Sequence, residues 1–138
     1  MSSAYFSGPT GTPTQPGRMM VIDEDLPRLE LAPGLTAHAL LGSNLLVSFV
    51  RYEPNSTAPI HAHEEEQVFF VLEGELEMTL GEEVRMMRPG DAALIPAWVP
   101  HGVRSFDKGA YQVDVFNPPR KAFLDLLAAR QAEAPERP

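Results

Sequence analysis

Short β-like runs follow one another along most of the chain, and this rhythm limits the folds that are open to it. Turn-forming pairs such as Glu73-Gly74 and Gly81-Glu82 separate the runs. The runs are LTAHALL, LLVSFVRY, QVFFVL, ELEMTL, EVRMM, AALI, GVRSF and YQVDVF. Parallel strands need a crossover of about a dozen residues or more, and the spacing here leaves no room for one. The pattern therefore predicts an all-β fold of antiparallel strands, either a sandwich or a barrel.

The chain divides into four predicted parts within a single domain. At 138 residues, of which 43% are hydrophobic, it is long enough to bury one core. Residues 1–17 mix Gly, Pro, Ser and Thr without a charged residue, which predicts a flexible N-terminal segment. We expect the β domain over residues 18–120 and a tail over residues 134–138. Residues 121–133 carry apolar side chains at helical spacing, which predicts one short C-terminal helix.

Composition excludes two classes of partner. No apolar run approaches the roughly 20 residues of a membrane helix, so we expect no membrane partner. The first residues show no basic segment followed by an apolar one, so no secretory signal is expected and the cytoplasm is the predicted location. The net charge is −8, and the 11 Lys and Arg residues are scattered. Nucleic-acid binding depends on clustered basic residues, so we expect no nucleic-acid partner.

Two neighbouring runs differ in how their apolar residues alternate. ELEMTL alternates apolar and polar residues, which is typical of a strand with one face in water. VFFVL is apolar throughout, so both of its faces should be covered. The outer face, formed by Val68, Phe70 and Leu72, packs most simply against another subunit or an added N-terminal strand. We therefore expect a homodimer.

Three of the four histidines lie in two short stretches, HAHEEEQ and PAWVPHG. His61 and His63 would share one face of an extended strand, because side chains alternate with a period of two. Gln67 has the same parity, so its amide oxygen can reach the same side, and His101 would supply a fourth ligand. The histidines could instead be satisfied by hydrogen bonds without a metal. His38 stands apart from both stretches and is expected to be a structural strand residue.

The stretch around the histidine pair resembles the first motif of the cupins, G(X)5HXH(X)3-4E(X)6G. The HAH pair and Gly74 match this motif, whereas Gln67 stands where the motif has its glutamate. Pro54 or Asn55 stands where the opening glycine usually lies. A neighbouring glutamate, Glu65 or Glu66, could be the acidic ligand instead, although the spacing to Gly74 favours the glutamine.

The second cupin motif, G(X)5PXG(X)2H(X)3N, follows in the right order. Gly90, Pro96 and His101 match it, whereas Trp98 replaces its glycine and Ser105 its asparagine. The resemblance implies a cupin jelly-roll β-barrel over the β domain and a metal site at the histidines.

The predicted ligand set has a chemical consequence. Three imidazoles and a neutral amide suit divalent Zn, Ni, Mn or Fe, so the metal is expected to be one of these. A carboxylate ligand at about 4 Å would repel a substrate carboxylate by about 4 kcal/mol at an effective dielectric constant of about 20, and Gln67 removes that repulsion. The site therefore favours a small anionic substrate and Lewis-acid chemistry, and it favours dioxygenase chemistry less.

A second constellation, DVFNPPR, follows the last β-like run. Asp114 and Phe116 share one face, and the prolines after them would leave Arg120 as a fixed cation. Arg120 could bind a carboxylate bidentately, and Asp114 could act as a general acid or base. The segment is similar to one in the small cupins of pectin and alginate breakdown that linearise 4,5-unsaturated monouronates. That resemblance implies functional roles for Asp114, Phe116 and Arg120; alternatively, the arginine caps a strand end and the aspartate forms a salt bridge.

These observations lead to one main hypothesis and two others. The main hypothesis is a metal-dependent enzyme that opens the ring of an unsaturated uronate and gives its keto form. Arg120 would hold the substrate acid, Asp114 would move the proton, and Phe116 and Trp98 would shape the pocket. The second hypothesis is another cupin reaction, either dioxygenation or an isomerisation or cyclisation in secondary metabolism. The third is a non-catalytic cupin that binds a small molecule.

Overall fold

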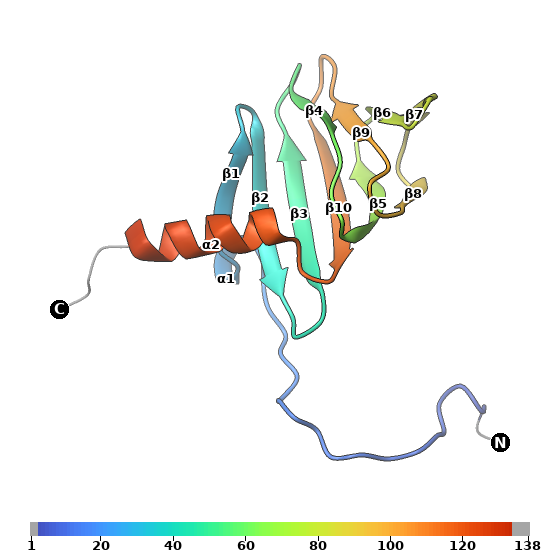
Figure 1. Cartoon of the computed structure of the whole chain (residues 1–138), viewed down its shortest axis with the longest axis vertical. Coiled ribbons are helices and arrows are strands. Elements are labelled where there is room, and N and C mark those ends of the chain that lie inside the picture. The colour runs from blue at the N-terminus through green and yellow to red at the C-terminus, as the bar shows by residue number, and fades with distance from the viewer. Residues whose placement is uncertain (1–2, 134–138) are drawn as a thin grey trace.

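The computed structural model describes residues 3–133, which form ten strands and two helices (Figure 1). The predicted tail, residues 134–138, lies outside the described residues. Neither helix of the described part is long and apolar enough to cross a membrane. Residues 3–17 form no strand and extend away from the sheets with exposed side chains (Figure 1). Their predicted flexibility stays a prediction.

The strands form two antiparallel sheets, as the closely spaced runs predict. The larger sheet has the order β1 (Arg28–Ala32), β2 (Leu35–Leu41), β3 (Leu46–Tyr52), β10 (Ala110–Asn117), β5 (Glu66–Glu73) and β8 (Ala92–Ile95). The smaller sheet has the order β4 (Thr57–His61), β9 (His101–Arg104), β6 (Leu76–Leu80) and β7 (Glu83–Met87). Within residues 3–133 no strand of one sheet is hydrogen-bonded to the other, so the closed jelly-roll barrel stays a prediction.

Two helices flank the strands. The predicted C-terminal helix is confirmed as α2, Lys121–Glu133. Its buried Phe123 packs with the ring centroid 5.6 Å from that of Phe116 on β10, which ties the helix to the sheet interior. A four-residue helix, α1 (Ile22–Asp25), was not expected from the sequence. The backbone N–H of Val21 donates to the carboxylate of Asp25 at 2.8 Å, which closes this single turn.

The core lies between the two sheets. Its fully buried side chains come from both sheets, and they include Leu46, Phe69, Leu76, Ile95 and Phe116. The alternation expected for ELEMTL is confirmed, since Leu76 and Met78 are buried while Glu75 is exposed.

The other face of β5 is only partly covered by the described residues, with Phe70 half-buried on it. Phe69 and Val71 point into the core, whereas Val68 and Leu72 on the opposite face are 38% and 44% exposed. Leu94 of β8, which neighbours Val68 in the ladder, is 58% exposed. No N-terminal strand of the described chain covers this apolar outer face.

The strand directions gather the candidate functional residues at one end of the sheets. β4 ends at His61 and β9 begins at His101. Near the end of β10, Phe116 lies directly opposite Gln67, which is near the start of β5. The tight turn after β5 lies at the opposite end of the sheets. There Gly74 has a φ of 76° and passes close to the β9–β10 turn.

We expect Gly74→Ala to destabilise the fold more than Gly81→Ala. Both glycines have a left-handed backbone, with φ of 76° and 59°, so both substitutions carry a similar conformational cost of roughly 1–2 kcal/mol. A Cβ at Gly74 would also lie 2.6 Å from the carbonyl oxygen of Gly109, whereas a Cβ at Gly81 meets nothing within 4 Å. The clash should add at least about 1 kcal/mol to the loss in unfolding free energy measured in urea. Equal losses for the two variants would contradict this account.

Candidate metal centre

Three histidines converge at one end of the sheets. His61 is the last residue of β4 and pairs with His101, the first residue of β9. His63 lies two residues beyond the end of β4, in the link to β5, rather than on a continuous strand. The ring centroid of His101 nevertheless lies 4.3 Å from that of His61 and 4.9 Å from that of His63. One nitrogen of each ring lies within 4.8 Å of the others, so the three could hold one metal ion.

Backbone carbonyls fix how each imidazole is presented. In all three rings Nδ1 lies at hydrogen-bonding distance from a carbonyl oxygen two residues away in the chain. These carbonyls belong to Pro59, Glu65 and Val99, at 2.7, 2.9 and 2.9 Å. A neutral imidazole has one N–H, so an Nδ1–H that donates to a carbonyl leaves Nε2 with a free lone pair. This is the tautomer that a metal centre bound through Nε2 requires.

Burial also keeps two of these rings neutral. Burial lowers the pKa of His61, and the charges of Arg120 and His63 lower it further. Burial lowers the pKa of His101 to about 4 against the opposing effect of the hydrogen bond to Val99, and the charges of His61, His63 and Arg120 lower it further. Neutral imidazole is the form that binds metal, so these side chains are available as ligands near neutral pH.

Two contacts fit a cation among these rings. Nε2 of His101 is buried and has no hydrogen-bond partner among residues 3–133. Nε2 of His63 faces Oε1 of Gln67 at 3.0 Å, and both atoms are acceptors when the imidazole is neutral with its proton on Nδ1. Two facing acceptors repel each other unless a cation lies close to both. The donor set of nitrogen and amide oxygen suits divalent Zn, Ni, Mn and Fe alike.

Asp114 is held in the interior by two amides. It is only 4% exposed, and its carboxylate oxygens accept N–H bonds from Gln67 and Gln112, each at 2.8 Å. Burial raises the pKa of Asp114 to about 6, against the opposing effects of both amides and of the Arg120 charge. Within the described residues Asp114 forms no salt bridge, which argues against the ion-pair alternative for this residue.

Arg120 and Phe116 lie beside the histidines. Phe116 is buried, and its ring centroid is 5.7 Å from that of His63. The guanidinium of Arg120 lies 5.8 Å from the Phe116 ring, and its Nε is buried without a hydrogen-bond partner in the described part of the chain. Burial lowers the pKa of Arg120, although the negative charges of Glu65 and Asp114 oppose that shift. Arginine stays charged in proteins, so it provides a fixed cation.

An internal cavity joins these residues. It has a volume of about 60 Å³ and extends from His61 and His101 into the space between the sheets. Its polar lining from the larger sheet consists of Tyr52, Gln67, Gln112 and Asp114. The smaller sheet contributes His61 and His101, and its other lining residues are apolar. Burial and the nearby Asp114 raise the pKa of Tyr52, so its hydroxyl stays protonated.

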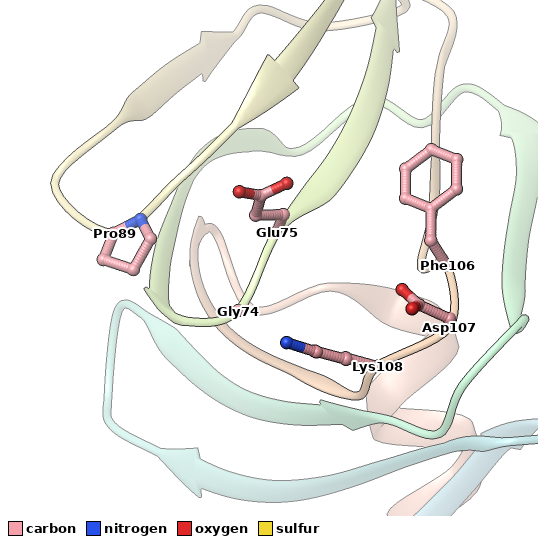
Figure 2. A pocket seen from close by; sticks show the side chains of 6 residues that line it. All are labelled: Gly74, Glu75, Pro89, Phe106, Asp107 and Lys108. Carbon is pink, nitrogen blue, oxygen red and sulfur yellow. The ribbon is translucent and has the colours of Figure 1, made fainter.

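A larger pocket of about 470 Å³ lies at the opposite strand ends (Figure 2). Its lining residues are Gly74, Glu75, Pro89, Phe106, Asp107 and Lys108. No histidine lines it, and the carboxylate of Glu75 already pairs with Arg88 at 3.3 Å. The side chains that could hold a metal ion therefore lie at the smaller cavity and not at this pocket.

Three other candidate residues, Glu65, Glu66 and His38, are not part of the histidine cluster. Glu65 accepts the backbone N–H of Lys121 at 2.7 Å, and its other carboxylate oxygen lies 3.8 Å from Nδ1 of His63. It therefore lies beside the histidine cluster but is not one of the three groups that could hold a metal ion together. Glu66 is exposed. His38 lies on β2, with Nδ1 3.7 Å from a carboxylate oxygen of Asp23, away from the cluster.

The backbone conformation explains how two residues can replace glycines of the cupin motifs. Asn55 and Trp98 stand where the cupin motifs carry glycine, and their φ values of 56° and 67° keep the left-handed backbone that glycine adopts easily.

Trp98 is 64% exposed and does not line the cavity, so its predicted role in shaping the pocket is not supported. Gln112 and Tyr52 were not predicted as site residues, although Gln112 shares the parity of Asp114 on the same strand.

Comparison with known proteins agrees with this geometry. The family described as Cupin domain matches residues 48–113. The pectin degradation protein KdgF of Dickeya dadantii (strain 3937) is 29% identical over 109 residues, which cover 78% of this chain and 99% of that protein. The H2HPP isomerase of Bacillus subtilis is 32% identical over 98 residues, which cover 64% of this chain and 41% of that protein.

A solved structure extends the likeness to the fold. The structure of KdgF from Halomonas sp. matches with a TM-score of 0.72 and 24% identity, over 78% of this chain and 99% of that chain. Residues 48–113 therefore match the cupin domain, and the chain is similar in sequence to a KdgF protein and similar in fold to a solved KdgF structure.

Proposed function

We propose that this cupin is a metal-dependent enzyme that opens the ring of 4,5-unsaturated uronate monosaccharides and releases the open-chain keto acid. The observation that carries the proposal is a cavity lined by Asp114, Arg120 and two histidines, His61 and His101, of a three-histidine cluster. The likeness to a pectin degradation protein supports a sugar acid as the substrate. The cytoplasmic location expected from the sequence stays a prediction.

The proposed metal centre holds one divalent ion between His61, His63, Gln67 and His101. The facing acceptor atoms of His63 and Gln67 support the amide as the fourth ligand. When bound, such an ion supplies Lewis acidity towards a substrate carboxylate or ring oxygen. Because Gln67 is neutral, the ligand set adds no negative charge that would repel the acid.

Arg120 is the proposed carboxylate-binding residue. Its buried Nε has no partner among the described residues, so it can donate to a ligand without first breaking a protein hydrogen bond. A guanidinium binds a carboxylate with two parallel hydrogen bonds, which fixes the direction of the acid group as well as its position. Phe116 lies beneath the guanidinium and would limit how the acid can tilt.

Asp114 is the proposed proton-transfer residue. Its pKa of about 6 lies near neutrality, where a carboxyl group can both accept and return a proton. In ring opening the anomeric hydroxyl loses a proton as the bond between the anomeric carbon and the ring oxygen breaks. The electrons pass to the ring oxygen and leave an enolate, which takes up a proton at carbon to give the ketone. Asp114 would accept the first proton and return it in the second step.

An isomerisation of another substrate is the second candidate. The similarity to H2HPP isomerase favours it over dioxygenation, although the matched region covers only 41% of that protein. Oxygen consumption by iron-loaded protein separates dioxygenation from both isomerisations, because neither isomerisation uses oxygen.

We also propose that a second copy of the chain covers the outer face of β5 and β8. Val68, Leu72 and Leu94 form an exposed apolar patch there that the described residues leave uncovered. A strand that is apolar on both faces is typical of a sheet buried on both sides.

The first prediction from the proposed function concerns the metal. Purified untagged protein should contain about one divalent transition metal ion per chain by elemental analysis, and His101→Ala should remove most of it. His38→Ala is the matched control, because this histidine lies outside the cluster, and it should retain the metal of the unmodified protein. Full metal content in His101→Ala would contradict the proposed centre.

The second prediction concerns the reaction. Ultraviolet absorbance of the conjugated enol should fall faster with protein than in buffer when unsaturated galacturonate or mannuronate is added. Arg120→Gln should lower kcat/KM on the order of 100-fold, because a charge-assisted hydrogen bond is lost. Lys121→Gln, a neighbouring and exposed cation, should leave kcat/KM within about twofold. No acceleration over buffer by metal-loaded protein would sink the proposal.

The third prediction concerns the second copy. The protein should sediment as a dimer, and Val68→Arg should sediment as a monomer because it places a charge in the apolar contact. Val84→Arg is the control, since Val84 on β7 is 59% exposed on the other sheet, and this variant should stay dimeric. A monomer at all concentrations of the unmodified protein would refute the dimer.

A further inference from the structure

We propose that Gln112 is a positioning residue which acts through Asp114 to keep the amide oxygen of Gln67 directed at the histidines. The inference deepens the proposed metal centre and rests on Gln67 as its fourth ligand. It assigns a role to a buried side chain that the proposed reaction does not otherwise use.

The three side chains form one hydrogen-bonded series. Nε2 of Gln112 donates to Oδ2 of Asp114 at 2.8 Å, and Nε2 of Gln67 donates to Oδ1 of the same carboxylate at 2.8 Å. Oε1 of Gln67 then faces Nε2 of His63 at 3.0 Å. The series therefore runs from the interior of the sheet to the edge of the histidine cluster, with all three members buried.

The series decides which end of the Gln67 amide meets a cation. Only the oxygen of a primary amide can bind a metal ion, and rotation by half a turn would present the NH₂ group instead. A carboxylate can only accept hydrogen bonds, so Asp114 holds the NH₂ group of Gln67 on its own side. The oxygen is thereby left on the side of the histidines.

Gln112 in turn holds the carboxylate. It lies two residues before Asp114 on β10, so both side chains point to the same side of the sheet. Its N–H occupies the second carboxylate oxygen, which prevents the group from rotating away from Gln67. Its own Oε1 is buried with no partner among the described residues, which is a cost that an apolar side chain at this position would avoid. Gln112 therefore stabilises the position of the Asp114 carboxylate, while its own amide oxygen stays without a hydrogen-bond partner among the described residues.

A double-mutant cycle with Co²⁺ as the probe tests this role. The dissociation constant and the d–d absorption of bound Co²⁺ are measured for the unmodified protein, Gln112→Leu, Gln67→Leu and the double variant. Gln112→Leu should weaken Co²⁺ binding at least about tenfold, as residues that orient a ligand typically do, and should shift the spectrum towards that of Gln67→Leu. In the Gln67→Leu background the same substitution should change the dissociation constant less than about twofold.

Controls separate this role from general damage to the core. Ser48→Ala alters a buried polar side chain directly opposite Asp114 that has no hydrogen-bond partner within residues 3–133, and it should leave Co²⁺ binding unchanged. If Gln112→Leu does not fold, Gln112→Met replaces it in the cycle with the same expected result.

Three results would overturn the inference. They are an unchanged Co²⁺ affinity and spectrum in Gln112→Leu, an equal loss of affinity with and without Gln67, or an equal loss in Ser48→Ala. The uronate assay is read separately. Unmodified protein that binds Co²⁺ but does not act on uronates would remove the proposed reaction, and the cycle would still decide the role of Gln112. Unmodified protein that binds no Co²⁺ would overturn both.

Discussion

The hydrogen bonds between the three histidine Nδ1 atoms and backbone carbonyls are the interaction on which the candidate site depends. Each carbonyl lies two residues from its histidine, so the local backbone sets the orientation of each ring. The antiparallel pairing of β4 with β9 then brings His61 beside His101, and His63 in the following link completes the cluster. The positions of His61 and His101 therefore depend on strand pairing, and the orientation of each of the three rings depends on the local backbone.

The charged side chains beside this cluster, Asp114 and Arg120, are not neutralised by ion pairs within the described residues. The ligand atoms are neutral, the Asp114 carboxylate is satisfied by two amides, and Arg120 forms no ion pair within the described residues. Burial acts on each group in the direction expected from its charge: it lowers the pKa values of His101 and Arg120 and raises that of Asp114. With a metal ion bound at the histidines, such a cavity would suit a small anion, which could interact with that ion and with Arg120. The outer face of β5 adds a separate apolar surface on the same sheet.

The sequence predicted those features of the structure that are determined by residues close together in the chain. Strand runs, the turn at Gly74 and the amphipathic spacing around Phe123 gave the antiparallel sheets and the C-terminal helix. The spacing of the HAH pair predicted that the histidines converge, although His63 lies beyond the strand. Hydrogen-bond direction could not be read from the sequence. Whether Gln112 donates to Asp114 depends on side-chain positions that parity alone does not determine, and the exposure of Trp98 depends on the path of its loop.

The central claim is that His61, His63, Gln67 and His101 hold one metal ion, and an anomalous diffraction experiment on crystals grown with Zn²⁺ tests it most directly. The account predicts a single anomalous peak among the three imidazoles, bonded to each Nε2 and to Oε1 of Gln67 at about 2.0–2.2 Å. Asp114 should accept the amide N–H of Gln67 in the same crystal. A peak bound elsewhere would contradict this ligand set. So would the absence of a peak at these four residues in crystals grown with saturating Zn²⁺.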